Sequence, residues 1–484
     1  MTSKNRIVAL ALAAFLLAVG LLAIPARLYI GDPYTWREEA INILLFHRIS
    51  IPPVIALHHG EPYQYFTKNP RTGEWYSKYG IASGLLNVIP LGAELAVEKK
   101  LTPWDSPRRR LYLGVFYALL GAGFGAALFA LGVRVGASAG ATVLFILATV
   151  FATFAGFYLR ATNSEAYQLL FFTLFLERVA AFRAGGFRRG RDAWLAWFWL
   201  LCLVHVKVSH VLVAAVFAGV MLVPREARRR ALALNAAPLA LLAASVGALN
   251  WWKFGSPFQS GYTLWARDDF SHGVPPWRIV WNLFLDPQWS IPLHFPLVVL
   301  AAFGARGFAR RYPFESAVVG LSFLVDVAFV GSMPIWQGGW SYGPRYFLFL
   351  LPALSLPAHA SFERFLDAAE MCKPRVAALL SGTVAALGVS AFLQFEAARL
   401  DPFFAYWVRP PVDEKQDATI ARYFDHAPLG WIAAEAWWAR QNVDELWWMK
   451  RLKADVSPDL YEQERKRLGE WVRKTNFYWW SPRD

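Results

Sequence analysis

The sequence has little charge and almost no cysteine. Of its 484 residues only 17% are charged and 56% are hydrophobic, whereas a soluble chain of this length usually carries more charge and divides into several domains. The two cysteines, Cys202 in an apolar run and Cys372 in a basic loop, provide no disulfide framework, and we expect two inert thiols. Internal repeats and low-complexity tracts are also lacking. These absences argue against an ordinary soluble protein.

Long apolar runs stand where charge is missing. Most of them are long enough to cross about 30 Å of hydrocarbon as helices. The net charge of +14 does not indicate a nucleic-acid partner, because Lys and Arg cluster at the ends of apolar runs, as loop charge does in membrane proteins. We therefore expect an all-α polytopic membrane protein with about eleven transmembrane helices. The expected spans are 7–29, 112–133, 138–158, 167–183, 193–206, 208–223, 231–251, 292–309, 316–334, 346–360 and 377–396.

The first apolar run has an alternative interpretation as a cleaved signal peptide. It follows Lys4 and Arg6 and extends from Ile7 to Ile30, which is longer than the core of a usual signal peptide. We therefore expect a retained first helix.

The basic loops set the expected orientation. Positive loops mark the cytoplasmic side. The four basic loops all face inward only under two conditions: 193–223 must be a hairpin of two short helices, and the apolar segment 81–98 must not span. Asn87, Pro90, Glu94 and Glu98 in that segment favour an interfacial element. The N-terminus is then inside and the C-terminus outside. The basic loops are Arg183–Arg191, Arg225–Arg230, Arg306–Arg311 and Arg364–Arg375; the outer segments are 31–111, 159–166, 252–291, 335–345 and 397–484.

This orientation predicts two regions. Residues 1–396 form a transmembrane catalytic domain whose first outer loop is 31–111, with juxtamembrane helices on its outer face. Residues 397–484 form a Trp-rich region outside the membrane. Its many aromatic residues argue against disorder. A small helical domain on the membrane surface and a carbohydrate-stacking surface are both compatible with it.

Three outer positions carry candidate chemistry. Asp32 follows the first helix, where a carboxylate could act as a general base or cap a helix before Pro33. Lys78 stands among aromatic residues and could hold a phosphate or snorkel to the interface. Lys207, an ionisable residue in an apolar hairpin, is a functional candidate by default. His205 and His210 beside it are five residues apart and do not match the i, i+4 spacing of a metal site.

A glycine-rich stretch, Trp336 to Tyr346, precedes a later span. Its glycines permit close backbone approach, and Arg345 at the start of the span could grip a phosphate with two nitrogens or serve as an interfacial anchor.

Together these motifs resemble the GT-C glycosyltransferases, the superfamily of the protein O-mannosyltransferases and aminoarabinose transferases. The resemblance covers about residues 1–400. It rests on Asp32 after the first helix, the run Tyr76-Ser77-Lys78-Tyr79-Gly80, Arg160 with Glu165, Lys207, the stretch Asn250 to Tyr262, and the run Gly338 to Tyr346.

The resemblance implies inverting sugar transfer from a polyprenyl-phosphate donor on the outer face of a plasma (inner) membrane. Asp32 matches the base, and Lys78, Lys207 and Arg345 are candidates for the donor phosphate. Many relatives have a second acidic residue where Pro33 stands, so Glu38 or Glu39 are alternatives for the base. Asp268 and Asp269 are not the spaced pair of a metal-dependent relative, and we expect no essential metal or cofactor. The remaining candidate substrate-binding residues are Arg37, Tyr76, Tyr79, Arg160, Glu165 and Tyr342.

Two alternatives to a transferase are a transporter or flippase of lipid-linked sugars and an inactive structural subunit. A transporter requires polar residues along its spans or broken helices near the midplane, whereas here the polar residues gather at one face. The acceptor stays open among a protein, lipid A, a wall polysaccharide and a glycolipid.

Overall fold

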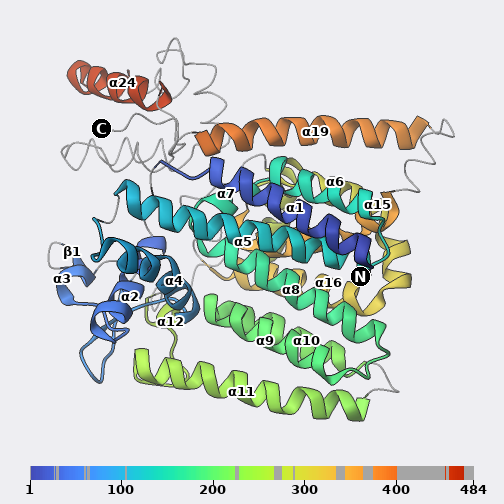
Figure 1. The fold of residues 1–484 in the computed structure, drawn as a ribbon, viewed down its shortest axis with the longest axis horizontal. Coiled ribbons are helices and arrows are strands. Elements are labelled where there is room, and N and C mark those ends of the chain that lie inside the picture. The colour runs from blue at the N-terminus through green and yellow to red at the C-terminus, as the bar shows by residue number, and fades with distance from the viewer. Residues whose placement is uncertain are drawn as a thin grey trace.

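The structure is a computed structural model of the full chain. It describes residues 2–26, 28, 32–58, 61–62, 66–103, 106–223, 228–265, 275–286, 289–333, 344–362, 374–399, 453 and 457–473. These residues are mostly helical (Figure 1), which confirms the expected all-α membrane fold. Among them, six helices are long and apolar enough to cross a membrane, and two shorter ones are also apolar. The chain is a multi-pass membrane protein, and the expected number of eleven spans stays a prediction.

The long helices lie where the apolar runs indicate. In chain order they are α1 (Ser3–Leu22), α5 (Pro107–Arg134), α6 (Ala139–Phe151), α8 (Ser164–Ala184), α9 (Gly190–Val206), α10 (Val211–Met221), α11 (Arg228–Phe254), α15 (Leu297–Arg311), α16 (Pro313–Gly331) and α19 (Pro374–Arg399). Several of them, α5, α11 and α19 among them, run roughly parallel along the length of the molecule in Figure 1. Shorter helical pieces connect them: α7 (Ala155–Arg160), η1 (Val208–His210), η3 (Arg345–Leu350) and α17 (Leu351–Leu354).

Local sequence explains where several of these helices begin. The Ser106 side chain accepts a hydrogen bond from the Arg109 N–H, and Pro107 occupies the first turn of α5. Ser138 caps α6 in the same way, through the N–H of Ala141. Such side-chain acceptors satisfy backbone donors that a helix leaves without partners.

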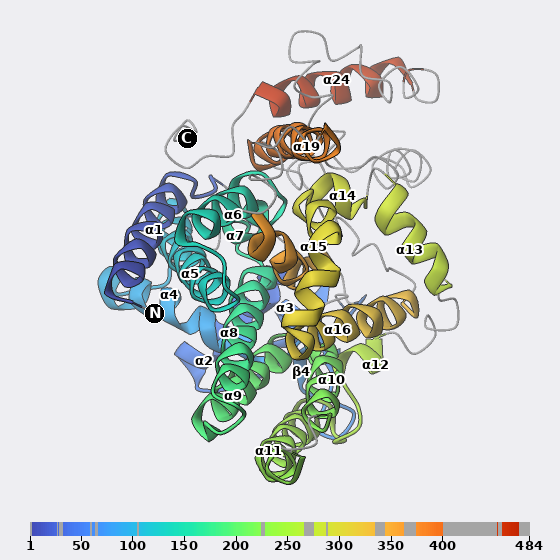
Figure 2. The same cartoon turned by 90° about the vertical axis from the view of Figure 1, so that its right-hand side faces the viewer.

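Helix α8 lies in the middle of the bundle. In both views α1, α5, α6, α7 and α19 lie on one side of it, and α9, α10, α11 and α12 (Gly261–Trp265) lie on the other (Figures 1 and 2). Its residues Phe172, Phe175 and Val179 are almost completely buried. Because α8 has neighbours on all sides, packing fixes the positions of the polar residues at its ends.

The expected hairpin over 193–223 is present. Helix α9 ends at Val206, Lys207 is extended, and η1 and α10 return along the bundle. Ion pairs join Arg134 at the end of α5 to Glu177 of α8 at 2.6 Å, and Arg183 at the end of α8 to Glu315 at the start of α16 at 2.5 Å. The orientation expected from loop charge stays a prediction.

Helix α4 (Ile81–Glu98) crosses the other end of the bundle. By length and hydropathy it counts among the six apolar helices. Two of its polar side chains, however, contact the first turns of other helices. Asn87 Nδ2 donates to Tyr167 Oη at the start of α8 (3.1 Å), and Glu94 pairs with Arg109 at the start of α5 (3.1 Å). Helix α4 thus packs against the first turns of α5 and α8, and its expected place at the outer surface stays a prediction.

The first outer loop packs around this helix. It contains α2 (Asp32–Phe46), α3 (Pro53–Ala56) and two antiparallel hairpins, β1 (Leu57–His58) with β2 (Glu61–Pro62) and β3 (Phe66–Lys68) with β4 (Trp75–Ser77). The hairpins were not expected. Asn69 Nδ2 donates to the Trp252 carbonyl at 2.9 Å, and the Arg71 guanidinium lies 4.1 Å from the Trp251 ring centroid. The loop is thereby held against the end of α11.

The remaining described helices are short or lie late in the chain. They are α13 (Pro276–Leu285), α14 (Ile291–His294) and α24 (Pro458–Arg473). Leu460 and Tyr461 of α24 are buried and pack on the main core. Most of the predicted 397–484 region lies outside the described residues, so the division at residue 396 stays a prediction.

Candidate active site

Asp32 is the first residue of α2 and lies at the end of the bundle that α4 crosses. The Tyr79 hydroxyl donates a hydrogen bond to its Oδ1, and Arg345 Nη2 lies 3.5 Å from its Oδ2. The Asp32 side chain keeps 18% of its surface exposed. Asp32 is thus held from two sides and remains reachable, as a group that exchanges a proton with a substrate must be.

Glu165 lies on the other side of Arg345. Its Oε1 is 4.0 Å from Arg345 Nε. It stands in the first turn of α8, whose backbone begins under the side-chain cap of Asn163. Arg345 therefore sits between two carboxylates that come from α2 and α8, a pattern typical of guanidinium groups that organise a polar site.

Lys78 lies close to the same group. Its Nζ is 5.4 Å from the Tyr79 ring centroid and 5.7 Å from that of Tyr262. Burial lowers the pKa of Lys78 to about 8, and the positive charges of Arg345 and Lys207 act in the same direction while Asp32 opposes them. The amine keeps its proton below that pH and carries its charge in a largely desolvated position.

The backbone beside Lys78 is tightly enclosed. A Cβ on Gly261 would overlap the Lys78 backbone, and a Cβ on Gly80 would overlap the carbonyl group of His205. Glycine at these two positions allows α12 and the end of α9 to pack closely against the predicted first outer loop. The position of Lys78 is therefore fixed by the fold.

Lys207 completes the cluster from the turn between α9 and η1. Its Nζ lies 3.9 Å from the Tyr346 ring centroid, within cation–π range. Asp326 of α16 and Glu165 are the acidic groups whose charges act on it. Five candidates from five segments, namely Asp32, Lys78, Glu165, Lys207 and Arg345, thus come together in one place.

The two alternative candidates for the base, Glu38 and Glu39, lie outside this cluster. Glu39 is completely buried, and its Oε1 accepts from Lys253 Nζ at 2.9 Å. Glu38 is buried near Arg37 and Arg109; burial raises its pKa, and the two arginines oppose that effect. Neither glutamate joins the Asp32 cluster, and the identity of the base stays a prediction.

Three other substrate-binding candidates lie in the described part of the chain. Arg37 is 3% exposed and buried within α2. The Tyr76 hydroxyl donates to Glu74 Oε2 at 2.6 Å, while its ring packs in a small core. Arg160 Nε donates to the Ala23 carbonyl at 2.7 Å and ties α7 to the end of α1. Tyr342 lies outside the described residues, as do Asp268 and Asp269.

The structure adds residues that sequence reasoning missed. Tyr262 packs edge-on against Tyr79 at 5.7 Å, Tyr346 faces Lys207, and Lys253 Nζ donates to the Tyr79 carbonyl at 2.9 Å. Asp326 carried a signal in the sequence, because an ionisable residue inside an apolar span marks a functional position. The expectation that polar residues gather at one face overlooked it.

A metal centre is not apparent in the described part of the chain. It contains no group of three or more His, Cys, Asp or Glu side chains placed to hold an ion. The charges that converge on the site are instead the cations of Lys78, Lys207 and Arg345 facing the carboxylates of Asp32 and Glu165. Such an arrangement can bind an anionic group and accept a proton within the same site.

Comparisons with known proteins identify the fold. No protein-family model matches the sequence, and no curated protein sequence matches it. Three solved structures of an oligosaccharyltransferase from Archaeoglobus fulgidus do match. The apo form aligns at a TM-score of 0.50 with 13% identity over 95% of this chain. The form tethered to an acceptor peptide with the NVT sequon aligns at 0.53 with 13% identity over 93%. AglB in complex with an inhibitory peptide and a dolichol-phosphate aligns at 0.51 with 12% identity over 88%.

The chain has a GT-C fold. It spans 59% to 61% of the length of these oligosaccharyltransferase chains, so the similarity covers about three fifths of each. At such low identity the likeness concerns the fold, and the expected GT-C architecture is confirmed.

Proposed function

We propose that the chain is a membrane glycosyltransferase that moves a sugar from a polyprenyl-phosphate donor to an acceptor hydroxyl. The observation that carries this proposal is the position of Asp32, which contacts Tyr79 and Arg345 and lies near Lys78 and Lys207. The GT-C fold supports it, because the structural neighbours are oligosaccharyltransferases and one of them is complexed with dolichol-phosphate.

In this proposal Asp32 is the general base. It removes the proton of the acceptor hydroxyl as the acceptor oxygen attacks the anomeric carbon, and the bond from that carbon to the phosphate oxygen breaks. Tyr79 orients the carboxylate through its hydrogen bond to Oδ1. A base held in this way contributes on the order of 10² to 10⁴ in rate.

The cations stabilise the leaving group. Lys78, Lys207 and Arg345 surround the space beside Asp32, and a phosphate gains negative charge as it departs. Fixed positive groups in a water-poor site stabilise such charge more than water does. We therefore expect transfer with inversion and without an essential metal or cofactor.

The membrane arrangement belongs to the proposal too. Residues 1–396 would form the catalytic domain in a plasma (inner) membrane, with the site on the outer face opposite the basic loops. Membrane lipid surrounds the chain, the lipid-linked sugar is its donor, and a glycan, lipid or protein is its acceptor. Residues 397–484 would form the Trp-rich region on the same outer face.

The test is transfer from a synthetic polyprenyl-phosphate sugar in proteoliposomes, followed by mass spectrometry of the products. Asp32→Asn should lower kcat by about 10² to 10⁴ while the amount of folded protein is unchanged. Asp459→Asn is the matched control, because Asp459 is exposed in the first turn of α24. Normal transfer by Asp32→Asn would remove Asp32 as the base. Movement of the lipid-linked sugar across vesicles by wild-type protein, without any transfer, would show a flippase.

A further inference from the structure

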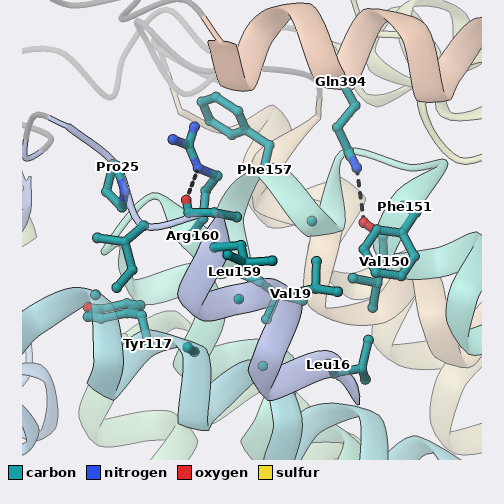
Figure 3. A pocket seen from close by; sticks show the side chains of 18 of the residues that line it. Leu16, Val19, Pro25, Tyr117, Val150, Phe151, Phe157, Leu159, Arg160 and Gln394 are labelled. Atoms are coloured by element: carbon teal, nitrogen blue, oxygen red, sulfur yellow. Dashed lines mark hydrogen bonds between the residues drawn. The ribbon is translucent and has the colours of Figure 1, made fainter. Parts of the chain in front are cut away.

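A cavity lies beside the active site and takes no part in the mechanism above. Its volume is about 390 Å³, and α1, α5, α7, α19 and the end of α6 surround it (Figure 3). This volume lies within the range of small-molecule pockets. Its walls are aliphatic and aromatic side chains and glycines, among them Leu16, Val19, Gly121, Phe157, Leu159 and Ala391.

The cavity faces the lipid. Only 11% of the apolar stretch of α1, and 11% of that of α19, is buried inside the molecule, so these two helices are among the spans most exposed to hydrocarbon. At 1.5 Å per helical residue, the lining from Leu16 to Leu22 extends over about 9 Å along α1. Gln394 Nε2 donates to the Val150 carbonyl at 3.0 Å and joins α19 to α6 (Figure 3). An apolar space of this depth between lipid-exposed helices suits a hydrocarbon chain better than water.

The cavity opens at the end of the bundle where the site lies. Arg160 borders it, and its Nε donates to the Ala23 carbonyl just beyond α1 (Figure 3). Glu165, five residues along the chain, faces Arg345 and hence Asp32. A chain in the cavity therefore places its headgroup next to the proposed base, and the positive charge of Arg160 suits an anionic headgroup.

The two lysines lie on the opposite side. Lys207 follows α9, and Lys78 packs against α12, whereas α1, α5, α7 and α19 line the cavity beyond α8 (Figures 1 and 2). In an inverting displacement the acceptor oxygen and the leaving phosphate lie on opposite sides of the anomeric carbon. Because the proposed mechanism places the leaving phosphate against these lysines, we assign the cavity to the acceptor's side.

We propose that this cavity binds a hydrocarbon chain of the acceptor, which makes the acceptor an anionic membrane lipid with a free hydroxyl. This inference rests on the proposed function and narrows its acceptor class. A soluble peptide has no chain to place there.

Gly121 provides a variant that fills the cavity without disturbing the helices. A Cβ at this position would have Leu159 Cβ as its nearest neighbour, at 4.0 Å, so Gly121→Leu fits and extends into the space. Gly388→Leu on α19 is the matched control, because a Cβ there meets nothing within 4 Å and Gly388 does not line the cavity.

The first measurement is photolabelling in vesicles that contain phosphatidylglycerol with a diazirine near the end of one acyl chain. We expect adducts on Phe157 and neighbouring lining residues that Gly121→Leu abolishes and Gly388→Leu preserves. Adducts on the exposed face of α19 serve as the internal reference. Equal labelling of the lining in all three proteins, or none in wild type, would overturn the proposal. So would preferential labelling of the lining by a diazirine polyprenyl phosphate.

The second measurement is kinetic and uses the membrane acceptor that wild-type protein glycosylates. Displacing about two methylene groups from an apolar site should raise the acceptor KM about tenfold in Gly121→Leu, with the donor KM unchanged. Lost labelling with an unchanged acceptor KM would show a structural lipid and overturn the acceptor role. If wild-type protein transfers no sugar to any acceptor, the proposed function fails and the acceptor role fails with it, while the labelling still decides whether the cavity holds a chain.

Discussion

Removal of one buried cation should reveal how the site is held together. Lys253 and Glu39 form an ion pair in which both side chains are completely buried, and Lys253 also donates to the carbonyl of Tyr79. Lys253→Met leaves the Glu39 carboxylate without a partner. Breaking such a pair costs about 3–5 kcal/mol, which is a large part of the stability of a typical domain.

The pH dependence of this loss has a definite sign. Burial raises the pKa of Glu39, and Lys253 opposes that rise. Without Lys253 the carboxyl pKa rises further, so the native state binds a proton more readily than the unfolded state in the range above the ordinary carboxyl pKa. The native variant is then stabilised as pH falls. We expect the deficit of Lys253→Met to shrink between pH 8 and pH 5.

The assay is a double-mutant cycle in detergent, with free energies from denaturant titration. Glu39→Gln keeps the shape of the side chain and removes its charge. The double variant should recover most of the stability that either single variant loses, because no buried charge is left. A loss below about 1 kcal/mol in Lys253→Met, or additive losses in the double variant, would refute the reasoning.

Three further predictions concern binding, rate and topology. The affinity for polyprenyl phosphate, measured by titration calorimetry, should be constant below pH 8, where Lys78 is protonated, and should weaken above it by up to about tenfold per pH unit. The affinity of Lys78→Arg should not change with pH, and a flat wild-type profile would argue against Lys78 as a phosphate ligand. Arg345→Lys should lower kcat on the order of a hundredfold, because Arg345 reaches both Asp32 and Glu165 and a lysine ammonium cannot replace the paired N–H donors of the guanidinium. A near-normal kcat would contradict this role. In a cysteine-free background, an impermeant thiol reagent should label a cysteine at Lys99 from outside and one at Arg188 only from inside; the reverse pattern would invert the topology.

The sequence was sufficient to predict the helical bundle because apolar length and loop charge act locally. Hydropathy located the long helices, and the orientation inferred from the positive loops stays a prediction. Asp32, Lys78, Glu165, Lys207 and Arg345 were placed on one face from orientation alone, and their contacts follow from that face.

The remainder depended on packing between distant segments. Glu39 looked like a possible base because it lies near Asp32 in sequence, but its rotation about α2 turns it toward Lys253. The approach of Tyr262 to Tyr79 requires Gly261 to fit against Lys78, and no local pattern encodes that fit. Asp326 is the exception, since a charge in an apolar span was visible in the sequence.

Helix α4 has a consequence for biogenesis. A helix this long and apolar is one that could insert, and insertion would reverse every helix synthesised after it. Asn87 and Glu94, which find partners on α8 and α5, make residence in hydrocarbon costly. We therefore expect these two polar side chains to act as topogenic signals that keep α4 at the surface during synthesis and set the orientation of the helices that follow.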